Sequence, residues 1–127
     1  MKRVTPLLNV QDVETSLAFW RDILGFEVIQ TFVWEGRLAW AEIASGEARL
    51  MLNGRGGDPS GRMARERYTD VVLCFSVDDV HGLVRDLRVK GLQVDDPEAQ
   101  DYGLDEIVLR DPDGYDLAIS SPSVARV

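Results

Sequence analysis

The sequence of 127 residues contains one cysteine, Cys74, and one histidine, His81. One cysteine excludes an internal disulfide and a thiolate metal cluster, and it favours a reducing compartment such as the cytoplasm. The one histidine is expected at the surface of a helix, so we propose no Ser-His-Asp triad. No apolar run approaches the roughly 18 residues that a membrane span needs, and the first ten residues lack the apolar core of a signal peptide. We therefore expect a cytoplasmic protein that does not partner a membrane.

Both reactive side chains have ordinary interpretations. His81 follows the expected start of a helix, on the outer side of the expected sheet, so we interpret it as a solvated surface residue. Cys74 alternates onto the inner face of a strand, and we expect a buried structural thiol rather than a nucleophile, because nothing nearby in the sequence marks a lowered pKa.

The formal net charge is −8 and is unevenly distributed. Residues 64–127 contain fourteen acidic and seven basic side chains, whereas residues 1–63 contain eight and seven. A field of this sign repels a nucleic-acid backbone and favours neutral or cationic partners, so we expect no nucleic-acid ligand. The ordinary alternative is that the charge serves solubility.

One segment of the sequence occurs twice. Asp12–Val28 reads DVETSLAFWRDILGFEV and Asp79–Val94 reads DVHGLVRDLRVKGLQV. Both copies have Asp-Val, an apolar stripe at helical spacing, a glycine where the helix should end, and two apolar residues flanking one polar residue. Their starts are 67 residues apart, and the glycines Gly25 and Gly91 are 66 apart. An internal repeat of this kind predicts one structural module used twice.

The first module, residues 1–53, is expected to contain a strand, a helix and three more strands. Asp12 suits the N-cap of the helix, and Gly25 suits the position just after its end. The dipeptides Glu35-Gly36 and Ser45-Gly46 are typical of tight hairpin turns. The expected elements are a strand at Val4–Val10, a helix at Val13–Leu24, and strands at Phe26–Trp34, Arg37–Ala44 and Ala48–Asn53.

The second module, residues 70–127, repeats this order. Between the modules, residues 54–69 have glycine, proline and four arginines but no apolar period, so we interpret them as a linker with partial lid character. The tetrapeptide Asp111-Pro112-Asp113-Gly114 predicts a turn. The expected elements are a strand at Asp70–Val77, a helix at Val80–Lys90, a strand at Leu92–Val94, an acidic loop at Asp95–Gly103, and strands at Glu106–Arg110 and Tyr115–Ser120.

Each half is therefore a βαβββ module, and the predicted class is α+β, within a single domain of residues 1–127. Two such modules predict an eight-stranded curved mixed sheet with helices outside and a concave cleft inside. A ferredoxin-like βαββ arrangement is the alternative fold, and it needs one strand fewer after each helix. The two modules can pair within one chain or exchange across a dimer.

Five short motifs carry a resemblance to a known superfamily. They are Val10-Gln11-Asp12, Ser16-Leu17-Ala18-Phe19-Trp20, Leu24-Gly25-Phe26, Tyr102-Gly103 and Arg110-Asp111-Pro112-Asp113-Gly114-Tyr115. With the paired βαβββ modules, they resemble the vicinal oxygen chelate superfamily of glyoxalase I, extradiol dioxygenases, fosfomycin-resistance enzymes and bleomycin-resistance proteins. The resemblance covers nearly the whole chain outside residues 53–69. It implies a fold but no particular reaction, because this fold hosts several chemistries and pure binders.

Enzymes of this superfamily hold a divalent metal with four side chains, one from the first and one from the last strand of each module. Carried over by spacing, these positions are Thr5, Met51, Val72 and Ala118. Divalent cations want carboxylate oxygens or imidazole nitrogens, and none of the four supplies one. We therefore expect no metal, no other cofactor and no catalytic residue. A metal-dependent lyase, transferase or dioxygenase is the alternative, so enzymatic activity is left uncertain, leaning towards none.

The expected cleft mixes aromatic and apolar surface with a few polar groups, as small-molecule pockets do. We assign nine residues to it: Trp40, Glu42, Arg49, Met51, Asn53, Tyr102, Glu106, Val108 and Ala118. For Trp40 the alternative is packing in a core or a dimer interface.

Among superfamily members, the chain most resembles the metal-free bleomycin-resistance-type proteins. These proteins are small acidic dimers that bind a cationic glycopeptide. This resemblance implies a homodimer that sequesters an aromatic or cationic small molecule without catalysis. Besides this binding protein and the metal-dependent enzyme, a third hypothesis is an interaction module whose cleft is filled by its own side chains.

Overall fold

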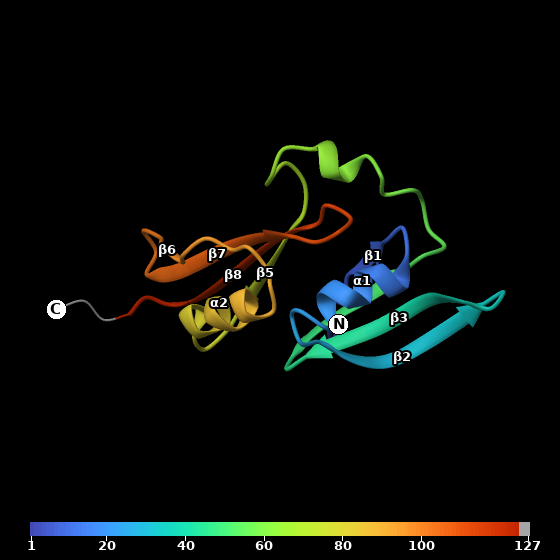
Figure 1. Ribbon diagram of the computed structural model, residues 1–127, viewed down its shortest axis with the longest axis horizontal. Coiled ribbons are helices and arrows are strands. Elements are labelled where there is room, and N and C mark those ends of the chain that lie inside the picture. The colour runs from blue at the N-terminus through green and yellow to red at the C-terminus, as the bar shows by residue number, and fades with distance from the viewer. Residues whose placement is uncertain (125–127) are drawn as a thin grey trace. The chain divides into compact units, whose positions relative to one another are not determined.

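Two βαβββ modules make up the chain, as the repeat predicts, and the fold class is α+β (Figure 1). This computed structural model describes residues 1–124. The eight strands are divided between two four-stranded mixed sheets, one in each module. The described residues form two compact units: unit 1 contains residues 1–65 and 111–114, and unit 2 contains residues 66–110 and 115–124.

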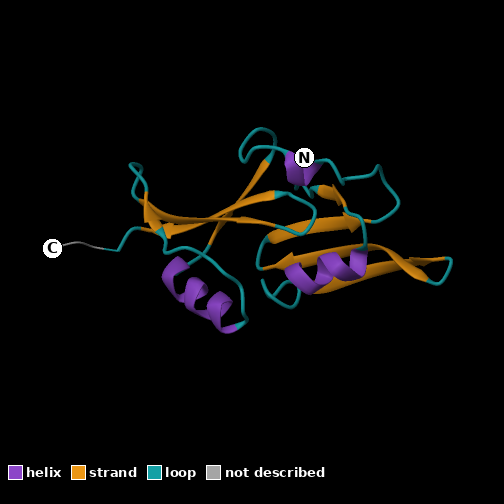
Figure 2. Ribbon diagram, turned by 45° about the horizontal axis from the view of Figure 1, so that its top comes forward, coloured by secondary structure: helices purple, strands orange, loops and turns teal. Residues whose placement is uncertain are grey.

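The sheet of unit 1 has the strand order β1-β4-β3-β2. Its strands are β1 (Leu7–Asn9), β2 (Glu27–Trp34), β3 (Arg37–Ser45) and β4 (Ala48–Asn53). The pairing of β1 with β4 is parallel and the other two pairings are antiparallel. Helix α1 (Val13–Trp20) packs on one face of this sheet, against β3 and β4 (Figure 2). The short helix η1 (Arg62–Ala64) lies in the segment that follows β4.

Helix α1 begins at Asp12, the N-cap that the sequence predicts. The Asp12 carboxylate accepts hydrogen bonds from the Thr15 hydroxyl and the Thr15 backbone N–H, and these bonds lower the pKa of Asp12. At the other end, Trp20 is fully buried, and its ring meets Phe19 and Phe26 edge to face. Its indole N–H donates to Asp111, a buried carboxylate that belongs to the same unit.

The sheet of unit 2 repeats this arrangement with the order β5-β8-β7-β6. Its elements are β5 (Val72–Ser76), α2 (Val80–Val89), β6 (Glu98–Ala99), β7 (Leu104–Arg110) and β8 (Asp116–Pro122). Only the β5–β8 pairing is parallel. Helix α2 covers one face through Val80, Val84 and Leu87, which are buried against β7 and β8.

The two modules share one pairing register. Leu7 pairs with Met51 in unit 1, and Cys74 pairs with Ala118 in unit 2. Both residues of the second pair lie 67 positions after their counterparts, which is the offset of the sequence repeat. The modules differ at the edge strand, since β2 has eight residues and β6 has two.

Three predicted elements differ from the structure by more than two residues, and the other predicted bounds agree within two. The first strand is shorter than Val4–Val10, because Pro6 has no N–H to donate to a ladder. Helix α1 ends at Trp20 rather than Leu24, and residues 21–24 form turns before Gly25, whose φ of +80° agrees with its predicted role. Leu92–Val94 is not a strand, and the edge strand is instead β6, inside the predicted acidic loop.

Candidate functional site

The five cleft residues predicted in the first module lie on the sheet face opposite α1. Trp40 pairs with Asn53 and Glu42 pairs with Met51, while the alternating residues Ala41 and Ile43 are buried towards the helix side. All five are half-buried. Two of the five form an ion pair, in which the Arg49 guanidinium lies 3.1 Å from a Glu42 carboxylate oxygen.

The four cleft residues predicted in the second module come together on the face opposite α2. Val108 pairs with Ala118 across β7 and β8, and Glu106 lies on the same side of β7. Tyr102, in the turn between β6 and β7, donates its hydroxyl to Glu106 over 3.1 Å. Ala118 is only 4% exposed and offers little surface to a ligand.

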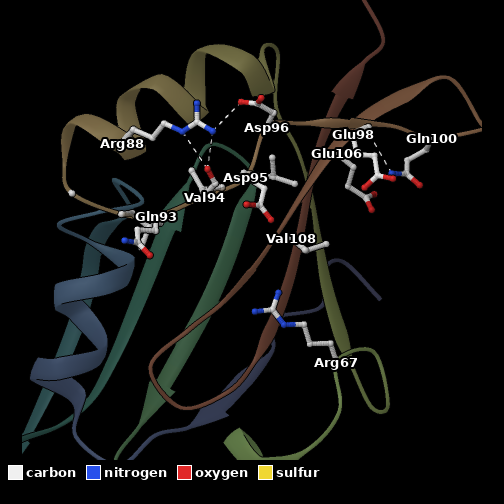
Figure 3. Close-up of a pocket in the computed structure, with 13 residues that line it drawn as sticks. Arg67, Arg88, Gln93, Val94, Asp95, Asp96, Glu98, Gln100, Glu106 and Val108 are labelled. Atoms are coloured by element: carbon white, nitrogen blue, oxygen red, sulfur yellow. Dashed lines mark hydrogen bonds and ion pairs between the residues drawn. The ribbon is translucent and has the colours of Figure 1, made fainter.

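A cavity of about 760 Å³ lies in unit 2 beside Glu106 and Val108 (Figure 3). It extends below the end of α2 and along the segment that leads to β6. The short β6 leaves this side of the sheet without a long edge strand, unlike β2 in unit 1. The labelled lining residues are Arg67, Arg88, Gln93, Val94, Asp95, Asp96, Glu98, Gln100, Glu106 and Val108.

Carboxylates dominate the charge of the cavity lining. Arg88 donates to the Val94 carbonyl over 2.8 Å and to the Asp96 carboxylate over 2.9 Å, so its charge is matched by one acid (Figure 3). Arg67 is the other cationic side chain of the lining. Three further acids, Asp95, Glu98 and Glu106, share the cavity with it, which gives the lining an excess of negative charge.

Two of these acids face each other across a strand pair. Glu98 of β6 is the register partner of Glu106 of β7, and both line the cavity. Directly opposed side chains on antiparallel strands point to the same face, with Cβ atoms about 5 Å apart. Like charges in such a pair destabilise the sheet, and a cation between them would remove the repulsion.

Two exposed tyrosines lie near Glu106. The pKa of the Tyr68 phenol is raised by burial and then by the charges of Glu106 and Asp116. The pKa of Tyr102 is raised by desolvation and then by its hydrogen bond to Glu106. Tyr68 is 49% exposed and Tyr102 is 63% exposed, so both rings are accessible from solvent.

The positions carried over from metal-dependent relatives do not fit a divalent metal. Met51 and Ala118 pair with Leu7 and Cys74, and Val72 pairs with Asp116 on the strand next to it. The four positions, Thr5, Met51, Val72 and Ala118, supply at most one weak hydroxyl and one thioether, and none of the carboxylate or imidazole ligands that such a metal prefers. Across residues 1–124, no group of three or more His, Cys, Asp and Glu side chains is placed to hold a metal ion.

His81 and Cys74 lie outside the cavity lining. His81 Nε2 is 2.8 Å from the Asp105 carboxylate, which is 2% exposed and also accepts from Ser123 Oγ. These bonds, the one to His81 first, lower the pKa of Asp105. Cys74 is exposed, so the prediction of a buried thiol is wrong. Cys74 belongs to β5, an edge strand of the sheet. Its side chain lies on the face that α2 does not cover.

Sequence reasoning missed most of the cavity lining. The sequence places Asp95, Asp96 and Glu98 in an acidic loop and predicts no role for them. The signal available in the sequence was the acidic excess of residues 64–127. The pairing of Glu98 with Glu106 was hidden, because it depends on β6, which is two residues long.

Residues 2–119 match the profile of the Glyoxalase/Bleomycin resistance protein/Dioxygenase superfamily, and the chain belongs to this superfamily. No curated protein matches the chain.

Several solved structures have the same fold. The antibiotic-binding protein TnmS3 from Streptomyces sp. CB03234 is 21% identical with a TM-score of 0.70, and the match covers 97% of this chain and 99% of that one. A bleomycin-binding protein complexed with bleomycin is 24% identical with a TM-score of 0.69, over 97% and 100% of the two chains. SMU.1112c is 26% identical with a TM-score of 0.74, over 95% and 99%.

Neither α1 nor α2, the α-helices among the described residues, is long and apolar enough to cross a bilayer.

Proposed function

We propose that this protein binds a cationic small molecule in the unit 2 cavity and sequesters it without chemical change. The observation that carries the proposal is the opposed pair Glu98 and Glu106 in the cavity wall. A ligand cation placed there would offset a repulsion that the protein otherwise bears. The cavity of about 760 Å³ has the size of a site for a drug-like molecule.

The comparisons support an antibiotic-like ligand. One similar structure contains a bleomycin-binding protein with bleomycin, and another is of an antibiotic-binding protein. Both cover nearly all of this chain at low sequence identity. The superfamily also contains enzymes, and the poor fit of the four carried-over positions to a metal favours binding over catalysis in this member.

The remaining parts of the proposal concern the aromatic surface and the assembly. Trp40 is half-buried on the unit 1 face opposite α1, and this face by itself offers a flat apolar contact to an aromatic compound. Strand β2 exposes the apolar side chains Ile29, Phe32 and Val33, which supports a homodimer through this edge. We expect the protein to act in the cytoplasm, where its single cysteine stays reduced.

The test is a binding screen of cationic aromatic compounds, bleomycin among them, against neutral aromatic compounds of similar size. A ligand at 100 times its dissociation constant should stabilise the fold by about 2.7 kcal/mol in thermal denaturation. Glu106→Gln should weaken binding of the cationic compounds by about tenfold, because a charge-assisted contact is lost. Glu47→Gln, an exposed turn residue of unit 1, is the matched control.

Mass spectrometry of the released ligand separates sequestration from catalysis. Recovery of the unchanged compound supports the proposal. A chemically altered ligand, or a screen in which no cationic compound binds more tightly than the neutral ones, would contradict it.

A further inference from the structure

The unit 2 cavity contains a positive charge that the protein itself does not neutralise. Arg67 lines the cavity together with several carboxylates. Within the described part of the chain, the Arg67 side chain takes part in no ion pair and no hydrogen bond. The other cation of the lining, Arg88, is bound to Asp96 over 2.9 Å. Arg67 is therefore the cation of this lining that remains available to a ligand.

The backbone next to Arg67 is fixed by hydrogen bonds. The Tyr68 backbone N–H donates to an Asp116 carboxylate oxygen over 3.2 Å. Asp116 belongs to β8 and is 8% exposed, so this bond ties the segment to the sheet. The Thr69 hydroxyl donates to the Glu66 carbonyl over 2.7 Å, which closes the turn around Arg67. The guanidinium is thus carried by a segment that is anchored at the cavity.

Arg67 and the opposed acids occupy different parts of this cavity. In Figure 3 the Arg67 guanidinium lies on the Val108 side of the cavity, apart from Glu98 and Glu106. Val108 is two residues from Glu106 on the same face of β7, a spacing of about 7 Å. Charges of opposite sign that line one cavity without pairing suit a ligand that carries both a cation and an anion.

The charge of the lining favours a carboxylate as the anion. A guanidinium presents its N–H donors in a planar fork that matches a carboxylate through two parallel hydrogen bonds. A phosphate group has the same fit but carries up to two negative charges. Asp95, Glu98 and Glu106 outnumber Arg67, so the cavity repels a doubly charged phosphate more strongly than a singly charged carboxylate.

We propose that Arg67 binds a carboxylate of the ligand, so that the cavity takes a zwitterion whose cationic group lies at Glu98 and Glu106. This inference rests on the proposed function and narrows its ligand from any cation to a compound with both charges, such as a short basic peptide. A ligand that carries only cations is repelled by Arg67. A ligand that also has a carboxylate gains a charge-assisted contact there.

The experiment compares the dipeptide lysylphenylalanine with its C-terminal amide by isothermal titration calorimetry at low salt. The two compounds have the same cations and the same ring, and they differ in the charge of the terminal carboxylate. In Arg67→Gln the affinity of the dipeptide relative to that of the amide should fall about fivefold from its wild-type value, as for a well-formed exposed ion pair. Arg67→Lys should keep part of the preference, because it keeps the charge without the fork.

The matched control is Arg85→Gln, which removes the same charge from an exposed arginine of α2 outside the cavity lining and should leave the affinity ratio unchanged. NMR spectra verify that the variants are folded. The same ratio in wild type and Arg67→Gln would overturn the inference.

Two further outcomes separate this inference from the proposed function. If neither peptide binds while cationic aromatic compounds still bind through Glu106, this inference is wrong and the proposed function stands. If Arg67→Gln lowers the ratio but Glu106→Gln changes neither affinity, Arg67 binds the carboxylate and the cation site of the proposed function is wrong. If no compound binds, both are wrong.

Discussion

Replacing Glu98 by glutamine should make the ligand-free protein more stable. The change removes one charge from the opposed pair with Glu106 and keeps the size of the side chain. At about 5 Å in water, two like charges repel by about 0.8 kcal/mol, and measured cross-strand effects run from about 0.2 to 1 kcal/mol. Glu98 is exposed and Glu106 half-buried, so we expect a gain of about 0.5 kcal/mol.

The gain is measurable by urea denaturation and thermal scanning at low salt. For a chain of this length it corresponds to a rise of about 2 °C in Tm. The gain should vanish in 1 M NaCl, where the screening length falls to about 3 Å. The same variant should bind the cationic compounds more weakly, so stability and affinity move in opposite directions.

Glu47→Gln is the control for a general effect of lowering the net charge, and its Tm should stay at the wild-type value. If Glu98→Gln is less stable than wild type at low salt, or if its gain persists in 1 M NaCl, the two carboxylates do not repel as argued. In that case the repulsion between Glu98 and Glu106 would no longer support a cationic ligand.

Three further outcomes are expected. Trp20→Ala should lower the free energy of unfolding by about 3–5 kcal/mol in urea denaturation, because a fully buried aromatic ring is lost; a loss below about 1 kcal/mol would contradict this role. The lowered pKa of Asp105 contributes stability that is present above the unfolded pKa of about 3.9 and is lost as the pH falls through the folded pKa. Asp105→Asn should therefore make the free energy of unfolding depend less steeply on pH at acid pH. An unchanged dependence would mean that other groups cause the loss of stability in acid. Chelator-treated protein should show no Tm shift with Ni²⁺, Mn²⁺, Zn²⁺ or Fe²⁺, whereas a saturable shift at one metal per chain would reveal a site built from other residues.

Local chemistry made most of the fold predictable. Gly25 and Gly91 adopt the positive φ that ends a helix, and Gly36 and Gly46 adopt the positive φ of the predicted hairpins. Strand β4 has the predicted bounds, because its apolar alternation is unbroken between two turns. The missed element is the edge strand of unit 2. Leu92 and Val94 have a strand-like pattern, but the Arg88 guanidinium takes the Val94 carbonyl, which a ladder would need.

The candidate site was predictable only in part, for a similar reason. Alternation along a strand is a local property, so residues such as Trp40, Met51 and Val108 fall on the predicted faces. The cavity depends instead on where the chain runs between α2 and β7. That path follows from the short β6 and the Arg88–Asp96 ion pair, neither of which has a clear signal in the sequence.

The parallel pairs β1–β4 and β5–β8 also have a consequence for how each module folds. Leu7 meets Met51 and Cys74 meets Ala118, so both pairings close chain segments of 44 residues (51 − 7 and 118 − 74). The hairpin β3–β4 closes over three residues, from Ser45 to Ala48, and hairpins form within about 1–10 μs. Closing the long segments costs more chain entropy, so β1 and β5 should join their sheets last. Pulse-labelled hydrogen exchange should find their amides protected after those of β3 and β7, and protection of β1 first would reverse this order.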